Sequence, residues 1–285
     1  MPVQFLGLVP ALFFALSNVL TRRGMDGSNP HTGSLVVVEV HFLLFAASLL
    51  AVDFTGVKFS WYWAAFLAAG VVSPALSLSL SFRSIAKIGV APTSSLSNVH
   101  AFFGAFWAFL ILGERPSSML WLGILIVVTG VYIFSGGRIG RVRPRDMVLP
   151  LSASACFGLA HTLRKLGFTG HEPLLFEAFL QAFSAAVAVP FMLRLGVGRK
   201  PLLFNRRSLA YFILAGAAMA LAQMTLLYAL RRGRVSVVSP IVSTAPLFTL
   251  LLTPILLRGR ERITLRLAAG IVLVVAGVVL VTSNR

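Results

Sequence analysis

The chain has 285 residues, of which 58% are hydrophobic and only 12% are charged, and its mean hydropathy is +0.90. Soluble domains are nearer ~25% charged, so this composition excludes an ordinary soluble protein and favours a membrane protein. The net charge of +17 would suit a nucleic-acid surface in a soluble protein. Here Arg and Lys lie between apolar runs, so we assign the charge to topology and lipid headgroups and expect no nucleic-acid partner.

Apolar runs long enough to cross a bilayer recur along the whole chain. The period-two alternation typical of a membrane β-barrel is absent, and helices satisfy the backbone within lipid. The first run ends in Thr21-Arg22-Arg23 rather than in a small-residue cleavage site, so we expect a span and not a signal peptide. The sequence therefore predicts an all-α membrane protein of about ten transmembrane helices, near residues 3–20, 34–53, 61–82, 89–112, 117–135, 147–163, 173–193, 208–230, 235–257 and 265–282.

The two halves of the chain repeat each other in order. At shifts of 142 to 147 residues, Arg22-Arg23 falls on Arg164-Lys165, Glu39 on Gln181, Ser97 on Ser243, Glu114-Arg115 on Glu261-Arg262, Gly123 on Gly270 and Gly130 on Gly277. Each repeat holds five spans, an odd number, so the second enters the membrane from the opposite side. We expect a first repeat at residues 1–136, a basic loop at 137–146 and a second repeat at 147–285. Such symmetry predicts a midplane site and alternating access, which a receptor or scaffold does not need.

Loop charges predict an orientation. One side of the membrane would carry 17 Arg and Lys residues and the other 8. Because the cytoplasmic side is the more positive one, the count places both termini outside.

Two strings carry a family resemblance. Leu112-Gly113-Glu114-Arg115-Pro116 precedes a helix with regularly spaced glycines, and Arg260-Glu261-Arg262 is its equivalent. The second string is Ser243-Thr244-Ala245-Pro246-Leu247-Phe248-Thr249. Over essentially its full length the chain resembles the drug/metabolite transporter superfamily, with tandem EamA-type domains.

The resemblance implies two inverted five-helix repeats around a cavity lined mainly by helices 1, 3, 4, 6, 8 and 9, with helices 5 and 10 peripheral. It also implies export or exchange of amino acids or other small metabolites, often coupled to protons, across the plasma (bacterial inner) membrane. Many members have cytoplasmic termini, against the charge count, and many carry Arg where Glu39 and Gln181 stand here.

Ionisable groups inside spans are functional candidates because lipid makes them costly. Glu39, near the middle of the second span, is expected to couple protons or to pair with a cationic substrate; the alternative is a structural partner for His41 or Arg22. Glu177 shares one helix face with Gln181 and Ser184, which either line the cavity or hold the seventh helix against its neighbours. Headgroup water is a further alternative for Glu177.

Other polar residues inside spans are candidates for substrate hydrogen bonds or a proton relay. They are Asn18, Ser97, Asn98, His100, Gln223 and Ser243. The alternative for each is a hydrogen bond between helices. The basic ends of the first and sixth spans, Arg22-Arg23 and Arg164-Lys165, could attract an anionic or carboxylate group, but we expect them to be snorkelling anchors. The glycines at 123, 130, 270 and 277 are expected at close helix packing, with a homodimer contact as one location.

An enzyme is not expected. His171-Glu172 lacks the second histidine of a zinc motif, Cys156 is the single cysteine, and no nucleophile elbow or ATP-binding loop occurs. No cofactor or metal is therefore expected, and the partners are a small molecule and membrane lipids. The prediction is a gradient-driven secondary transporter, with a lipid flippase or an intramembrane enzyme as alternatives.

Overall fold

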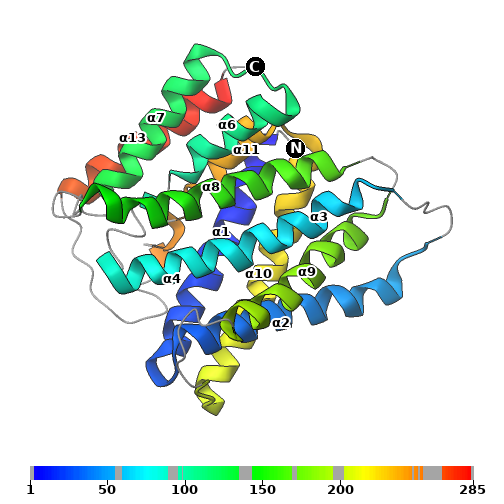
Figure 1. The fold of residues 1–285 in the computed structure, drawn as a ribbon. Coiled ribbons are helices and arrows are strands. Elements are labelled where there is room, and N and C mark those ends of the chain that lie inside the picture. Colours follow the sequence, from blue (N-terminus) through cyan, green and yellow to red (C-terminus); the bar gives the residue numbers. More distant parts are fainter. Residues whose placement is uncertain are drawn as a thin grey trace.

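The computed structural model describes residues 3–54, 60–88, 96–97, 99–134, 143–168, 172–194, 202–245, 247–249, 251–252 and 265–283 (Figure 1). The elements of the first half are α1 (Val3–Gly24), η1 (Met25–Gly27), α2 (Pro30–Ser48), η2 (Leu49–Ala51), α3 (Trp63–Gly70), η3 (Val71–Leu76), α4 (Ser77–Ile88), α6 (His100–Leu112) and α7 (Ser118–Phe134). Those of the second half are α8 (Pro144–Gly167), α9 (Leu174–Arg194), α10 (Arg206–Arg232), α11 (Val235–Val242) and α13 (Leu265–Ser283). Helices and turns account for the regular structure of these ranges, so the predicted all-α fold is confirmed.

The helices have the surface that lipid requires. In the described ranges, Pro30–Ala51, Leu174–Arg194 and Arg206–Arg232 are long and apolar enough to cross a bilayer, and shorter apolar helices include Trp63–Leu76, His100–Leu112, Ser118–Gly130 and Val272–Val281. Large side chains such as Leu43, Val187 and Val272 point outward, 59–66% exposed, whereas alanines dominate the buried positions. Small residues let helix backbones approach closely, which is how helices associate in membranes.

The packing of the helices repeats with the sequence. The repeat equates α1 with α8, α2 with α9, α3–α4 with α10, α6 with α11 and α7 with α13. Contacts then come in matching pairs: α1 packs on α10 as α8 packs on α3 and α4, α2 packs on α10 as α9 packs on α3, and α1 packs on α11 as α8 packs on α6. In addition α2 packs on α9, α6 on α11 and α7 on α13. This pattern is the one that a two-fold axis relating the halves produces.

Helices that correspond run antiparallel across that axis. Phe45 of α2 lies in an apolar cluster with Ala178 of α9, whereas Val38 clusters with the later residues Ala185 and Val189. Residue numbers therefore rise along α2 as they fall along α9. Two equivalent helices that run antiparallel show that the second repeat is inverted, as the odd number of spans predicts.

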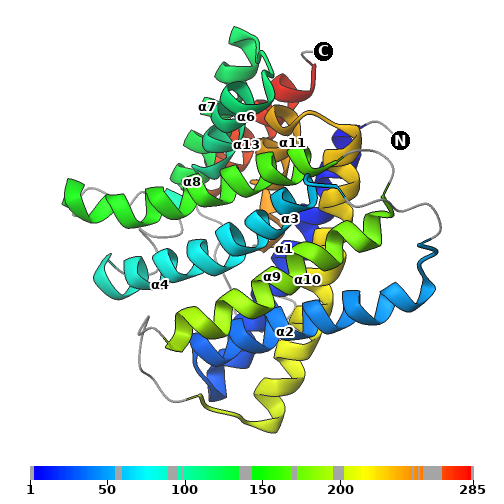
Figure 2. The same cartoon turned by 45° about the vertical axis from the view of Figure 1, so that its right-hand side comes forward.

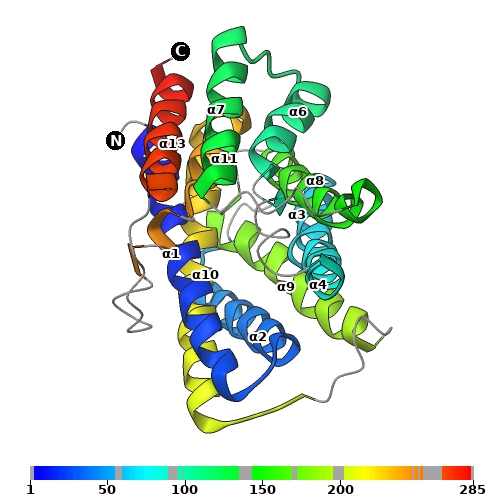
Figure 3. The ribbon, with the colours of Figure 1, turned by 90° about the vertical axis from the view of Figure 1, so that its left-hand side faces the viewer.

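The spaced glycines join α7 to α13. Atoms of Gly277 and Val281 surround the position where Gly123 would carry a side chain, and Gly270 and Val274 surround that position at Gly130. These glycines let the two backbones touch, so the predicted close helix packing is confirmed, and this contact lies within one chain. The pair of helices sits at one side of the molecule, away from α2 and α9 (Figure 3). This is the peripheral place that the resemblance implies for helices 5 and 10.

The signature after α6 ties the two repeats together. Gly113 ends α6 with a φ of 67°, in the left-handed region that favours glycine. The chain then presents Glu114, whose carboxylate accepts from the backbone N–H of Val235 at 2.8 Å and of Ser236 at 3.0 Å. These donors belong to the first turn of α11, so Glu114 caps that helix and complements its dipole. The equivalent Glu261-Arg262 lies outside the described residues.

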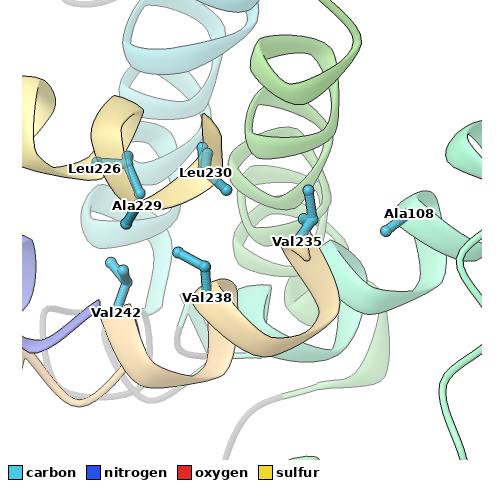
Figure 4. Packing of buried hydrophobic residues seen from close by; sticks show 7 residues of the cluster. All are labelled: Ala108, Leu226, Ala229, Leu230, Val235, Val238 and Val242. Atoms are coloured by element: carbon cyan, nitrogen blue, oxygen red, sulfur yellow. The ribbon is translucent and has the colours of Figure 1, made fainter. Parts of the chain in front are cut away.

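Apolar side chains pack between α10, α11 and α6 beside this cap. Leu226, Ala229 and Leu230 near the end of α10 face Val235, Val238 and Val242 of α11, with Ala108 of α6 alongside (Figure 4). All seven residues are at most 5% exposed. The two short-linked helices α10 and α11 are thereby fixed against α6 of the first repeat.

Candidate functional site

Arg164 places a positive charge inside the helix bundle. Its side chain lies near the C-terminal end of α8 and is only 2% exposed. Its Nε donates to Oε1 of Gln181 on α9 at 2.7 Å, and Nη2 donates to the Ser73 carbonyl at 3.4 Å. The expectation that Arg164 snorkels toward lipid headgroups is therefore wrong, because the side chain points into the protein.

Lys165 has a different role from its neighbour. It is partly buried, and its Nζ donates to the carbonyls of Leu230 at 2.7 Å and of Arg231 at 3.4 Å. Those carbonyls belong to the last turn of α10, where a cation interacts favourably with the helix dipole. Lys165 therefore joins α8 to α10 instead of reaching for headgroups.

An interruption of the third span supplies the carbonyl that Arg164 binds. Pro74 has no backbone N–H and cannot continue the helical hydrogen-bond ladder. Ser73 accordingly leaves helical geometry, with φ −147° and ψ 120° inside η3. Because the Ser73 carbonyl has left the helical ladder, it can accept from a side chain of another helix. The equivalent stretch of the second repeat, in α10, is continuous helix.

Several buried polar atoms on the helices around α9 have no hydrogen-bond partner in the described part of the chain. Both carboxylate oxygens of Glu177 are among them, with Nε2 of Gln181, Nε2 of His41 and Oε1 of Gln223. These four residues are 1–4% exposed and come from α9, α2 and α10. His41 also interacts electrostatically with Arg164. Buried polar groups are normally paired, so unpaired groups on three helices that pack on one another are a candidate binding site.

A second polar group lies one turn before Arg164 on α8. His161 Nδ1 is 3.2 Å from the hydroxyl of Ser239 on α11, and its ring meets that of His100 edge to face at 6.3 Å between centroids. His100 Nδ1 is 3.0 Å from the Ser97 carbonyl, which also accepts from Ser154 of α8 at 2.9 Å. Two imidazoles in contact between α6, α8 and α11 form a candidate proton relay. Within the described ranges, no three His, Cys, Asp or Glu side chains are grouped to bind a metal ion.

The remaining predicted residues lie elsewhere. Glu39 is half-buried, and Asn18 is exposed, whereas its neighbour Ser17 is buried and donates to Ala215 of α10. Ser243 is buried but donates to the carbonyl of Pro240 in its own helix at 2.7 Å. Asn98 lies outside the described residues. Of the predicted residues, Glu177, Gln181 and Gln223 are buried with unpaired polar atoms in the described ranges, and Ser97 contacts His100.

The sequence indicated Arg164 only as a basic helix end, and it did not predict that Ser73 and His41 would interact with that arginine. A basic pair at the end of an apolar run looks the same whether it reaches lipid or the protein interior. Two signals were present: Pro74 within an apolar run, and a histidine one turn before Arg164 on the same helix face. Neither signal identifies the partner helix, which depends on packing.

The two repeats match one family model separately. The EamA-like transporter family covers residues 1–136 and again residues 146–283. The chain belongs to the EamA-like transporter family. This membership agrees with the inverted helix pairs and with a multi-pass membrane protein.

Relatives and a solved structure agree with this assignment. The pseudopaline exporter CntI of two Pseudomonas aeruginosa strains is 27% identical over 192 residues, which span 66% of this chain and 65% of the exporter. A protein of Methanocaldococcus jannaschii, MJ1333.1, is 31% identical over 81 residues, or 28% of this chain and 58% of that protein. A crystal structure superposes with a TM-score of 0.80 at 15% identity, covering 98% of this chain and 94% of that one, and supports the fold.

Proposed function

We propose that this protein is a secondary exporter that moves amino acids or related small metabolites across the bacterial inner membrane by alternating access. The observation that carries the proposal is the group of unpaired polar atoms of Glu177, Gln181, His41 and Gln223, buried where helices of the two inverted repeats meet. Inverted repeats place a substrate site between them, and exchanging their conformations opens that site to each side in turn. The similarity to an exporter supports the outward direction.

Proton coupling is part of the proposal, and we assign it first to Glu177. An ionised carboxylate at that position would lack the hydrogen-bond donors that stabilise buried charge, since neither oxygen has a partner in the described ranges. Uptake and release of a proton would therefore change the energy of the surrounding helices. Glu39, in the other repeat, is half-buried and is the second carboxyl proposed for this role.

Transport can be tested with the purified chain in liposomes. Vesicles are loaded with an unlabelled amino-acid mixture, and entry of each labelled amino acid is followed by exchange, with protein-free vesicles as the control. Saturable exchange faster than in the control is expected. If no labelled compound exchanges while a fluorescent lipid crosses the bilayer in a protein-dependent way, the protein is a lipid flippase and the proposal fails.

A further inference from the structure

Arg164 is a buried cation without a counter-ion in the described part of the chain. Both of its described acceptors, the Gln181 amide oxygen and the Ser73 carbonyl, are neutral. The described salt bridges join other residues, Lys87 and Arg145 to Asp146 and Arg234 to Glu114. Glu177 lies one turn before Gln181 on the same face of α9, but it interacts electrostatically with Arg231. An arginine stays charged in proteins, so this guanidinium keeps a full positive charge where charge is costly.

Comparison of the two repeats shows what is special about this arginine. Its equivalent is Arg22 on α1, and the equivalent of Gln181 is Glu39 on α2. The first repeat thus has a basic and an acidic residue at these two positions, whereas the second repeat has a neutral amide in place of the acid. Arg22 is exposed, while Arg164 is buried. The second repeat therefore orients its arginine by hydrogen bonds and leaves the charge unneutralised.

We propose that Arg164 is an anion site that binds the carboxylate of a small organic substrate; this inference rests on the proposed function. The described bonds use two of the five N–H groups of a guanidinium, and its planar fork matches a carboxylate with two parallel bonds. Nε2 of Gln181 and Nε2 of His41, both unpaired in the described ranges, are further groups near the same charge. An amino acid carries such a carboxylate.

A purely structural role explains the arrangement less well. An arginine that only joined α8 to α9 could be replaced by a neutral hydrogen-bonding side chain without the cost of burying charge. The amide of Gln181 is neutral and does not offset the cost of burying the guanidinium charge. The helix interruption at Ser73 likewise offers a neutral carbonyl rather than an acid. A substrate carboxylate would supply the missing negative charge and occupy the free donors.

The test uses the purified full-length chain in detergent and matched pairs of probes. The pairs are L-leucine with L-leucinamide, benzoate with benzamide, and succinate with succinamide. A carboxylate that binds should raise the unfolding temperature, whereas its amide should not. Arg164→Gln should weaken carboxylate binding at least about tenfold, because a hydrogen bond to a charged group is lost.

Gln181→Glu is the sharper variant, because it keeps the guanidinium of Arg164 and gives it a carboxylate partner from the protein itself. The protein should fold at least as stably without ligand, and its carboxylate affinity should fall at least about tenfold. Arg22→Gln, at the equivalent exposed position, is the control and should respond like the natural chain.

Three results would overturn the inference: no carboxylate of the panel raises the unfolding temperature, amides stabilise as well as acids, or the response survives in both Arg164→Gln and Gln181→Glu. Flux separates this inference from the proposed function. Protein-dependent exchange of benzamide or leucinamide in liposomes, equal in the natural chain and in Gln181→Glu, would keep the transporter and remove the anion site. Carboxylate binding that depends on Arg164 without any flux would keep the anion site and remove the transporter.

Discussion

Glu39 and Glu177 occupy comparable places in the sequence, yet the fold gives them different surroundings. Each lies within an apolar run, on one of two helices that pack against each other across the two-fold axis. Glu177 is 1% exposed, and neither oxygen has a partner in the described ranges, whereas Glu39 is half-buried. Next to Glu177, Ala178 lies in an apolar cluster with Phe45 of α2, Phe66 of α3 and Leu227 of α10, so helices of both repeats cover α9 there.

We expect Glu177→Gln to remove the effect of a pH gradient on flux. A glutamine cannot release a proton. Exchange at equal pH should therefore persist, and uptake under a pH difference should fall to the uptake measured at equal pH. The measurement is labelled amino-acid uptake into liposomes with and without an imposed pH difference. Glu39→Gln is the matched variant, and it should keep the response. Loss of the response in Glu39→Gln alone would move proton coupling to the first repeat.

At the scale of single elements, α11 depends on a residue from another part of the chain. Its N-cap position is Arg234, whose side chain makes no capping hydrogen bond, and the first-turn N–H groups of Val235 and Ser236 are bonded by Glu114. The signature Leu112-Gly113-Glu114-Arg115-Pro116 therefore has a physical reason: glycine permits the turn, and glutamate caps the helix of the other repeat.

Glu114→Ala should destabilise the protein by about 1–2 kcal/mol, because two buried helix-terminal donors lose a charged acceptor. Thermal unfolding in detergent measures the change. Arg115→Ala, at the adjacent position where the side chain has no described role in the cap, is the control and should cost less. An unfolding temperature that Glu114→Ala leaves unchanged would contradict the capping role.

The contact between α7 and α13 makes a second prediction at this scale. Gly123→Leu should lower the unfolding temperature, because a side chain there meets the backbone of Gly277 and Val281, and forcing bulk into close packing costs about 1–3 kcal/mol. Leu125→Ala, at a position 53% exposed on the same helix, is the control. The oligomeric mass of the two variants should be equal, since the glycine contact lies within one chain. A change of mass in Gly123→Leu alone would place those glycines between copies.

At the scale of the whole molecule, symmetry is followed in the packing and broken at the site. Helix pairs correspond across the axis, and Phe66 packs over Gly167 as its equivalent Phe212 packs over Gly24. The break falls where chemistry is expected: η3 interrupts the third span, whereas its equivalent α10 is continuous. The two repeats therefore share one helix arrangement but differ in their buried polar groups, and this difference leaves a net positive charge at the site.

The start of α1 and the end of α13 lie at the same end of the molecule (Figure 2), as an even number of crossings requires. The loop charges then predict that both termini face away from the cytoplasm. A C-terminal alkaline phosphatase fusion should be active and a C-terminal fluorescent-protein fusion dark, because each reporter works on one side only. The reverse pattern would show that the family orientation, with cytoplasmic termini, overrides the charge count.

Much of this architecture follows from the sequence alone. Apolar runs of bilayer length dictate helices, because lipid leaves the backbone no other partner. An odd number of spans in each repeat dictates inversion. Glycines spaced by seven predict close packing, and the Glu-Arg signature with the repeat order indicates the family. These properties depend on local composition and on counting, which a sequence displays directly.

The site was decided by the tertiary structure. Whether a basic residue at a helix end meets lipid or protein depends on which helix packs beside it, so Arg164 and Lys165, adjacent in sequence, have separate roles. Likewise, the sequence allows the glycine faces to pack within one chain or between two chains, and the structure packs α7 against α13 of the same chain. Partner choice is a long-range property: the Ser73 carbonyl, the Gln181 amide and the Arg164 guanidinium come from three spans, and only their packing places them within hydrogen-bond distance.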